Sequence, residues 1–150
     1  MKDDSMTYQT IYFSASSTPM QVDELEDILE QAQSNNSRNG ITGALVYIDG
    51  SFLQILEGEK DRVQTLMQKI SKDFRHETVS ILHEGEIAAA AFTEWKMAYV
   101  SATAEQIARW AGLSGTTQLP EVWQDIQQDP SRATQLTNSI LSVLVGGSSS

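Results

Sequence analysis

Residues 40–58 read GITGALVYIDGSFLQILEG, which is two apolar runs joined by Asp49-Gly50. Asp-Gly is the pair that a two-residue type I′ turn prefers, so this stretch predicts a β-hairpin whose register is set by the turn. Because side chains alternate along a strand, every second residue shares a face. Counting outward from the turn predicts cross-strand pairs on one face: Tyr47 with Phe52, Leu45 with Gln54, and Gly43 with Leu56.

Gln54 is the one amide on that face of the predicted hairpin. The opposite face is also apolar, so both faces are expected to be covered; it carries Ala44, Val46, Ile48, Leu53 and Ile55. A buried amide without a partner costs roughly 1–3 kcal/mol. Gln54 therefore needs a polar partner, which can be a neighbouring backbone group, a buried water or a side chain placed there for function.

The composition excludes several classes of function. At 150 residues and 40% hydrophobic, the chain has the size of one domain with a substantial core. A net charge of −10 argues against a nucleic-acid partner, because that affinity comes largely from Lys and Arg. No apolar run reaches the roughly 18–20 residues of a membrane span, and the N-terminus lacks a secretion signal, so we expect a cytoplasmic protein without a membrane partner. With no Cys and two His, no metal site is expected.

Strand and helix patterns alternate over residues 8–100. Residues 8–15 predict a strand with one polar-tipped face, made of Tyr8, Thr10, Tyr12 and Ser14. Helical periodicity then covers about residues 18–33 and 59–72, and strand patterns cover 78–87 and 93–100. With the hairpin, the order is βαββαββ, which is typical of an α+β, ferredoxin-like sandwich with both helices on one sheet face. Strands 1 and 3 are neighbours in that topology, so Tyr12 and Gln54 are predicted to lie side by side.

The remaining residues predict appended C-terminal helices over 103–112, 119–129 and 131–145. Each has an apolar stripe, and we expect these stripes to cover the open sheet face, with a second subunit as the alternative. The Gly/Ser-rich residues 146–150 predict a flexible tail. The predicted organisation is a folded domain over 1–102, a helical extension over 103–145 and the tail over 146–150.

An ordered set of residues carries a family resemblance: Tyr12, Asn35-Asn36, Asn39-Gly-Ile-Thr-Gly43, Phe52-Leu-Gln54-Ile-Leu-Glu-Gly58, Asp73-Phe-Arg-His76 and Trp95-Lys-Met97. Over residues 8–100 this set resembles the BLUF family of flavin-based blue-light sensors. The appended helices resemble those of the short members that lack a fused enzyme domain. The resemblance implies that FAD, or occasionally FMN, inserts non-covalently between the two helices above the sheet.

The resemblance also implies which residues contact the flavin. Tyr12 is similar to the residue that donates an electron and a proton to the excited ring. Gln54 is similar to the amide that links this hydroxyl to flavin N5 and the C4 carbonyl. Asn36 matches the residue that hydrogen-bonds the C4 carbonyl and N3 edge, with Asn35 beside it.

Further matches lie outside this group and have ordinary structural readings as well. Arg75 and His76 match the position near the ring and the phosphate end, although a cation at a helix C-terminus is also favoured by the helix dipole. Trp95 and Met97 match strand residues that relay the signal, although an alternating aromatic-Met strand is equally typical of a core. Phe13 departs from the small or polar residue of several relatives, and strand alternation directs it to the opposite sheet face.

The implied function is a photoreceptor and not an enzyme, because light changes hydrogen bonds without a net reaction. We expect a homo-oligomer and a downstream regulatory protein as partners. Two alternatives remain open. A small flavin oxidoreductase would be expected to carry a Gly-x-Gly-x-x-Gly fingerprint, which this sequence lacks. A ferredoxin-like ligand-sensing domain without photochemistry is the other, since the fold hosts many functions.

Overall fold

The computed structural model describes residues 7–15, 27, 30, 33–34, 40–48, 51–72, 78–87, 92, 98–113 and 119–146. Within these ranges the elements are β1 (Thr7–Ala15), β2 (Thr42–Ile48), β3 (Ser51–Gly58), α2 (Lys60–Ser71), β4 (Thr78–Ile87), β5 (Ala98–Ser101), α3 (Ala104–Trp110), α4 (Leu119–Gln128) and α5 (Pro130–Gly146). Asp27, Glu30, Gln33 and Ser34 are also helical, in and just beyond the stretch predicted as the first helix.

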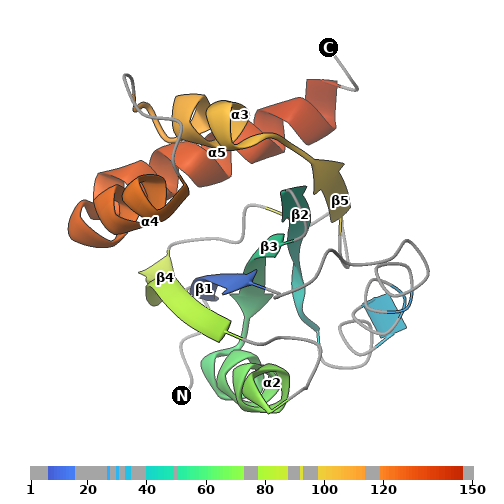
Figure 1. The fold of residues 1–150 in the computed structure, drawn as a ribbon. Coiled ribbons are helices and arrows are strands. Elements are labelled where there is room, and N and C mark those ends of the chain that lie inside the picture. Colours follow the sequence, from blue (N-terminus) through green and yellow to red (C-terminus); the bar gives the residue numbers. More distant parts are fainter. Residues whose placement is uncertain are drawn as a thin grey trace.

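The strands form one five-stranded sheet in the order β4-β1-β3-β2-β5 (Figure 1). The central strand β3 pairs antiparallel with β1 and β2, and β4 pairs antiparallel with β1. The added strand β5 is parallel to β2. Strands 1 and 3 are therefore neighbours, and the predicted α+β ferredoxin-like sheet is confirmed.

The hairpin has the register that its turn predicts. Tyr47 lies opposite Phe52, Leu45 opposite Gln54, and Gly43 opposite Leu56. The turn residues Asp49 and Gly50 lie outside the described ranges. Glycine is required at position 43, because an added Cβ would lie 1.8 Å from the backbone oxygen of Ile55. Gly40, just before β2, has a φ of 67°, a left-handed conformation that glycine adopts without strain.

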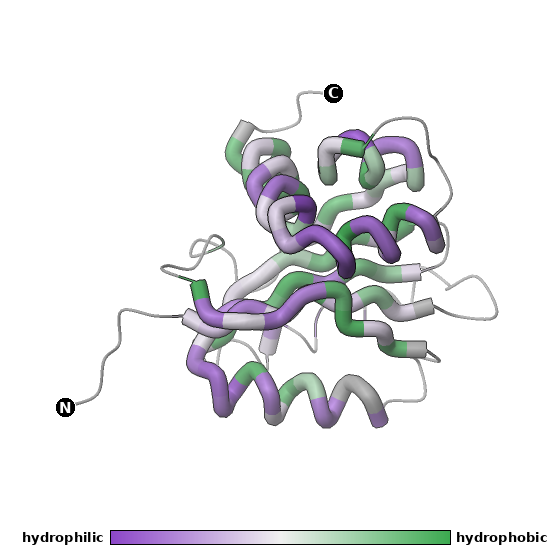
Figure 2. The backbone as a smooth tube through the Cα atoms, turned by 90° about the vertical axis from the view of Figure 1, so that its left-hand side faces the viewer, coloured by the Kyte–Doolittle hydropathy of each residue, from purple (hydrophilic) through white to green (hydrophobic). Residues whose placement is uncertain are grey.

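The sheet separates two apolar layers. Different helices pack against its two faces (Figure 1). Helix α2 packs on one face against β1 and β3. Helices α3, α4 and α5 pack on the other face, and Figure 2 shows the strands between these helices and α2. The buried residues of this second layer include Ile11, Val46, Leu53 and Ile55 from the sheet and Ile107, Val122, Ile126, Leu136 and Ile140 from the helices. The prediction that the C-terminal stripes cover the open sheet face is confirmed.

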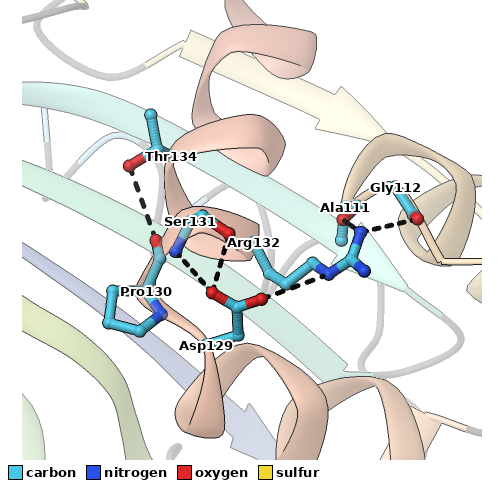
Figure 3. Close-up of polar contacts among 7 residues, drawn as sticks. All are labelled: Ala111, Gly112, Asp129, Pro130, Ser131, Arg132 and Thr134. Carbon is cyan, nitrogen blue, oxygen red and sulfur yellow. Dashed lines mark hydrogen bonds and ion pairs between the residues drawn. The ribbon is translucent and has the colours of Figure 1, made fainter.

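The ends of the C-terminal helices explain where the observed elements differ from the predicted ranges. Thr103 caps α3 and forms a capping box with Gln106. Asp129 was predicted to end the second appended helix, but its carboxylate accepts from the Ser131 N–H at 3.1 Å and caps α5, which starts at Pro130 (Figure 3). At the other end α5 includes Gly146, one residue of the predicted tail.

One arginine joins two of these helices. Arg132 on α5 donates to the carbonyl oxygens of Ala111, at 3.3 Å, and Gly112, at 2.7 Å, just beyond the end of α3 (Figure 3). It also lies 3.8 Å from the Asp129 carboxylate. These contacts stabilise the C-terminal end of α3, because the last carbonyl oxygens of a helix have no donor within the helix. The helical extension is thus held together by capping contacts as well as by its apolar layer.

Candidate functional site

Tyr12 and Gln54 meet at the centre of the sheet. They are directly opposite each other on the neighbouring strands β1 and β3. The Tyr12 hydroxyl donates a hydrogen bond to Gln54 Oε1. Tyr12 is fully buried, and Gln54 is 4% exposed. The predicted neighbourhood of the two side chains is confirmed, and the polar partner that Gln54 was expected to need includes a phenol.

The layer around this pair is apolar and aromatic. It lies on the α2 face and consists of Tyr8, Tyr12, Ile41, Leu45, Phe52, Leu56, Val63 and Met67, with Tyr47, Leu66 and Val79 packed against it. The strand β1 adds the buried hydroxyls of Thr10 and Ser14. Thr10 Oγ1 has no hydrogen-bond partner among the described residues. A layer with large apolar walls and few polar groups is typical of small-molecule and cofactor sites.

Tyr8 is a second phenol on the same strand and face. Its hydroxyl donates to Glu84 Oε1 at 2.8 Å, and the Lys60 ammonium lies 5.7 Å from its ring centre. Burial raises the pKa of Tyr8, and the Glu84 carboxylate that accepts its hydrogen bond raises it further. Tyr8 is therefore protonated at neutral pH. The two tyrosines differ in partner, since the Tyr8 hydroxyl is bonded to the Glu84 carboxylate and the Tyr12 hydroxyl to the Gln54 amide.

The other residues that the sequence predicted for the site are not placed. Asn35, Asn36, Arg75 and His76, predicted flavin contacts, all lie outside the described ranges. The predicted relay residues Trp95 and Met97 lie outside them as well. Their roles stay predictions.

The opposite face of the sheet carries a polar group that the sequence reasoning missed. Glu57 on β3 is fully buried, and Gln9 on β1 is 5% exposed. Gln9 Nε2 donates to Glu57 Oε2 at 2.9 Å, and the Phe92 backbone N–H donates to Glu57 Oε1 at 2.9 Å. The available signal was strand alternation, which places position 57 on the same covered face as Leu53 and Ile55.

A half-open cleft of about 580 Å³ lies on this second face, beneath α4. Its walls include Phe13, Leu82, Pro120 and Trp123. The rings of Phe13 and Trp123 are 4.6 Å apart, which confirms that Phe13 faces away from Tyr12. Because the sheet separates this cleft from the Tyr12–Gln54 pair, we do not assign a flavin to it.

Among the residues that the structure describes, no three His, Cys, Asp or Glu side chains form a group that could hold a metal ion. None of the helices in those ranges is both long and apolar enough to cross a bilayer.

Known proteins similar to this chain share one domain. Residues 7–98 match the BLUF family model, described as sensors of blue-light using FAD. The chain is 38% identical over 112 residues to the photoactivated adenylate cyclase subunit beta of Euglena longa, covering 74% of this chain and 13% of that protein. It is 35% identical to the subunit of the same name in Euglena gracilis, again covering 13% of the relative. The chain thus spans only a small part of the length of these curated relatives.

Solved structures extend the similarity to nearly the whole chain. BlsA in its photo-activated state is 29% identical, with a TM-score of 0.76 over 90% of this chain and 94% of that one. The BLUF protein BlrB in its dark state is 25% identical, with a TM-score of 0.71 over 92% and 97%. The family model alone covers more than half of the residues. The chain belongs to the BLUF family of blue-light sensors, whose domain binds a flavin.

Proposed function

We propose that this protein is a blue-light photoreceptor that binds FAD non-covalently and switches through the hydrogen bonds of Gln54. The observation that carries the proposal is the buried hydrogen bond from the Tyr12 hydroxyl to Gln54 Oε1, inside an apolar layer. A phenol can supply both an electron and a proton. An amide can turn by 180° and exchange its acceptor oxygen for its donor nitrogen. The pair therefore has the chemistry of a switch with two hydrogen-bond arrangements.

The described residues fit a flavin ring on the α2 face. The ring needs apolar walls, which Leu45, Phe52 and Leu56 supply. It also needs a few polar groups along its edge, and Gln54 and Thr10 lie in the same layer. On the family resemblance, Asn35, Asn36, Arg75 and His76 are proposed to hold the remaining edge and the phosphate end, with FMN as the alternative cofactor.

Bound flavin would supply the absorption of blue light and accept an electron and a proton. Tyr12 gives these up from its ring and hydroxyl and recovers them on recombination, so no net reaction remains. Gln54 is left rotated or tautomerised, with a different hydrogen-bond pattern. One or two altered hydrogen bonds correspond to about 1–3 kcal/mol, which shifts a near-balanced equilibrium between two conformations by about 5- to 150-fold.

The output of the switch is proposed to be an interaction and not catalysis. Residues 1–102 act as the photosensory domain, and the helices of 103–145 act as its extension. Trp95 and Met97 relay the change to a homo-oligomer contact or to a downstream regulatory protein in the cytoplasm. The α3–α5 layer supports this route, because it shares one continuous apolar core with the sheet.

The proposal is tested by the absorbance of the purified, FAD-loaded protein before and after blue light. We expect a yellow protein with a small red shift that reverses in the dark. Tyr12→Phe removes only the hydroxyl, so FAD is expected to remain bound while the shift disappears. Tyr8→Phe is the matched control, because Tyr8 is a buried phenol on the same strand whose hydroxyl bonds Glu84. It is expected to keep the shift.

Each alternative predicts a different result. A colourless preparation that cannot be reconstituted with FAD would favour the ligand-sensing domain. A yellow protein that has no red shift and consumes a reductant in steady turnover would favour the oxidoreductase. A normal photocycle in Tyr12→Phe would remove Tyr12 from the mechanism.

A further inference from the structure

Between β4 and β5 the structure describes one residue, Phe92. In the strand order β4-β1-β3-β2-β5 these two strands occupy opposite edges. Residues 88–97 join Ile87 at the end of β4 to Ala98 at the start of β5. Phe92 lies near the middle of this connection. It is fully buried in the apolar layer under the C-terminal helices.

Phe92 is bonded to the middle strand at that point. Its backbone N–H donates to Glu57 Oε1 on β3 at 2.9 Å. The second oxygen of the same carboxylate accepts from Gln9 Nε2 on β1, also at 2.9 Å. Glu57 thus joins three segments through one fully buried group. A buried carboxylate is costly unless it is hydrogen-bonded, so these two bonds constrain the group in position.

Glu57 is also close in sequence to the proposed switch. It lies on the same strand as Gln54, three residues later, and faces the other side of the sheet. Gln9 lies on β1 three residues before Tyr12, and it also faces the other side of the sheet. A change at the Tyr12–Gln54 pair that shifts β3 against β1 therefore acts on both sides of the Glu57 carboxylate. The segment that receives the change is the connection leading into β5.

We infer that Glu57 is a positioning residue that couples β3 to the β4–β5 connection, so that rearrangement of Gln54 is transmitted to β5 through the Phe92 hydrogen bond. This inference rests on the proposed function. It adds a defined route for the signal, on the face of the sheet opposite the apolar layer that surrounds Tyr12 and Gln54. It does not require Glu57 to touch the flavin or to change its charge.

The geometry predicts which substitutions preserve the coupling. In Glu57→Gln, the new Oε1 accepts from the Phe92 N–H, and the new Nε2 donates to Gln9 once the Gln9 amide turns by 180°. This variant is expected to behave like the wild type. Glu57→Met has similar length and no oxygen, so it loses both bonds. Ile55→Met is the matched control, because it alters packing on the same strand and face and leaves the Glu57 carboxylate itself unchanged.

The experiment is hydrogen exchange of backbone amides in FAD-loaded protein, in darkness and under blue light. In the wild type, the Phe92 amide is expected to be protected in darkness and to change its exchange rate on illumination. Glu57→Met is expected to keep the red shift but to reduce the light-dark difference over residues 92–101 by about threefold or more. Glu57→Gln and Ile55→Met are expected to keep that difference.

The outcomes separate this inference from the proposed function. If the wild type shows a normal red shift while exchange at Phe92 is equal in light and darkness, the coupling is refuted and the photoreceptor stands. This comparison uses the wild type alone, so it tests the inference even if Glu57→Met fails to fold. A wild-type difference that survives in Glu57→Met, or is lost in Glu57→Gln, also overturns the inference. Absence of any red shift in the wild type overturns both.

Discussion

The hydrogen bond between Tyr12 and Gln54 should be measurable as a coupling free energy in a double-mutant cycle. The side chains are 0% and 4% exposed, so water cannot readily replace either partner. Tyr12→Phe removes the hydroxyl from Gln54 Oε1, and Gln54→Leu removes the amide from the hydroxyl. Each leaves a buried polar atom without this partner, which costs about 1–2 kcal/mol. For a chain of 150 residues, each should lower Tm by about 2–8 °C.

The double variant removes both polar groups together. Its free energy of unfolding should therefore fall by about 1–2 kcal/mol less than the sum of the single losses. Urea unfolding followed by circular dichroism gives these values. It should be run in excess FAD and repeated at about tenfold higher FAD, because a change in flavin affinity shifts the apparent stability with concentration.

The control cycle combines Gln54→Leu with Tyr8→Phe. Tyr8 lies on the same strand and face, but its hydroxyl bonds Glu84 and its register partner is Gly58. The two losses should add within about 0.3–0.5 kcal/mol. If the Tyr12 and Gln54 losses were equally additive, the two side chains would not interact, and the central argument for the switch would be refuted.

Two further predictions concern the framework. Gly43→Ala should destabilise the protein by about 2–3 kcal/mol in urea unfolding, because the added Cβ meets the Ile55 backbone. Gly85→Ala, whose added Cβ meets open space, should be neutral or slightly stabilising. Equal effects of the two substitutions would contradict the close approach at Gly43. The Ser131 hydroxyl and N–H lower the pKa of Asp129 below 3.8, so its capping contribution is complete above that pH and is lost as pH falls through the lowered pKa. The stability difference between wild type and Asp129→Ala should shrink below about pH 4, and a constant difference would exclude the charged cap.

Local sequence patterns were sufficient to predict those elements whose determining interactions are close in sequence. The hairpin register follows from one turn and strict alternation, and the structure has the same cross-strand pairs. The predicted strand over 78–87 is β4 with the same bounds. The observed boundary between α4 and α5 differs by one residue from the predicted one, because the Asp129 side chain caps α5. A cap of this kind cannot be recognised from helical periodicity.

The candidate site was predictable in part. The placement of Tyr12 beside Gln54 required the strand order as well as alternation, and the predicted βαββαββ sequence of elements, typical of a ferredoxin-like sheet, supplied that order. The structure pairs these two side chains. The proposed contacts from Asn36 and Arg75 depend on segments outside the described ranges, so their roles stay predictions. The sequence thus determined the identity of the pair, and the tertiary structure determined its hydrogen bond.

The sequence by itself determined the two-faced hairpin and the apolar stripes of the C-terminal helices, because each depends on periodicity along one short segment. Only the tertiary structure decided what Glu57 does. Its carboxylate binds Gln9, 48 residues earlier, and Phe92, 35 residues later. No local pattern encodes such a contact, because it exists only when three segments are brought together and water is excluded from the carboxylate between them.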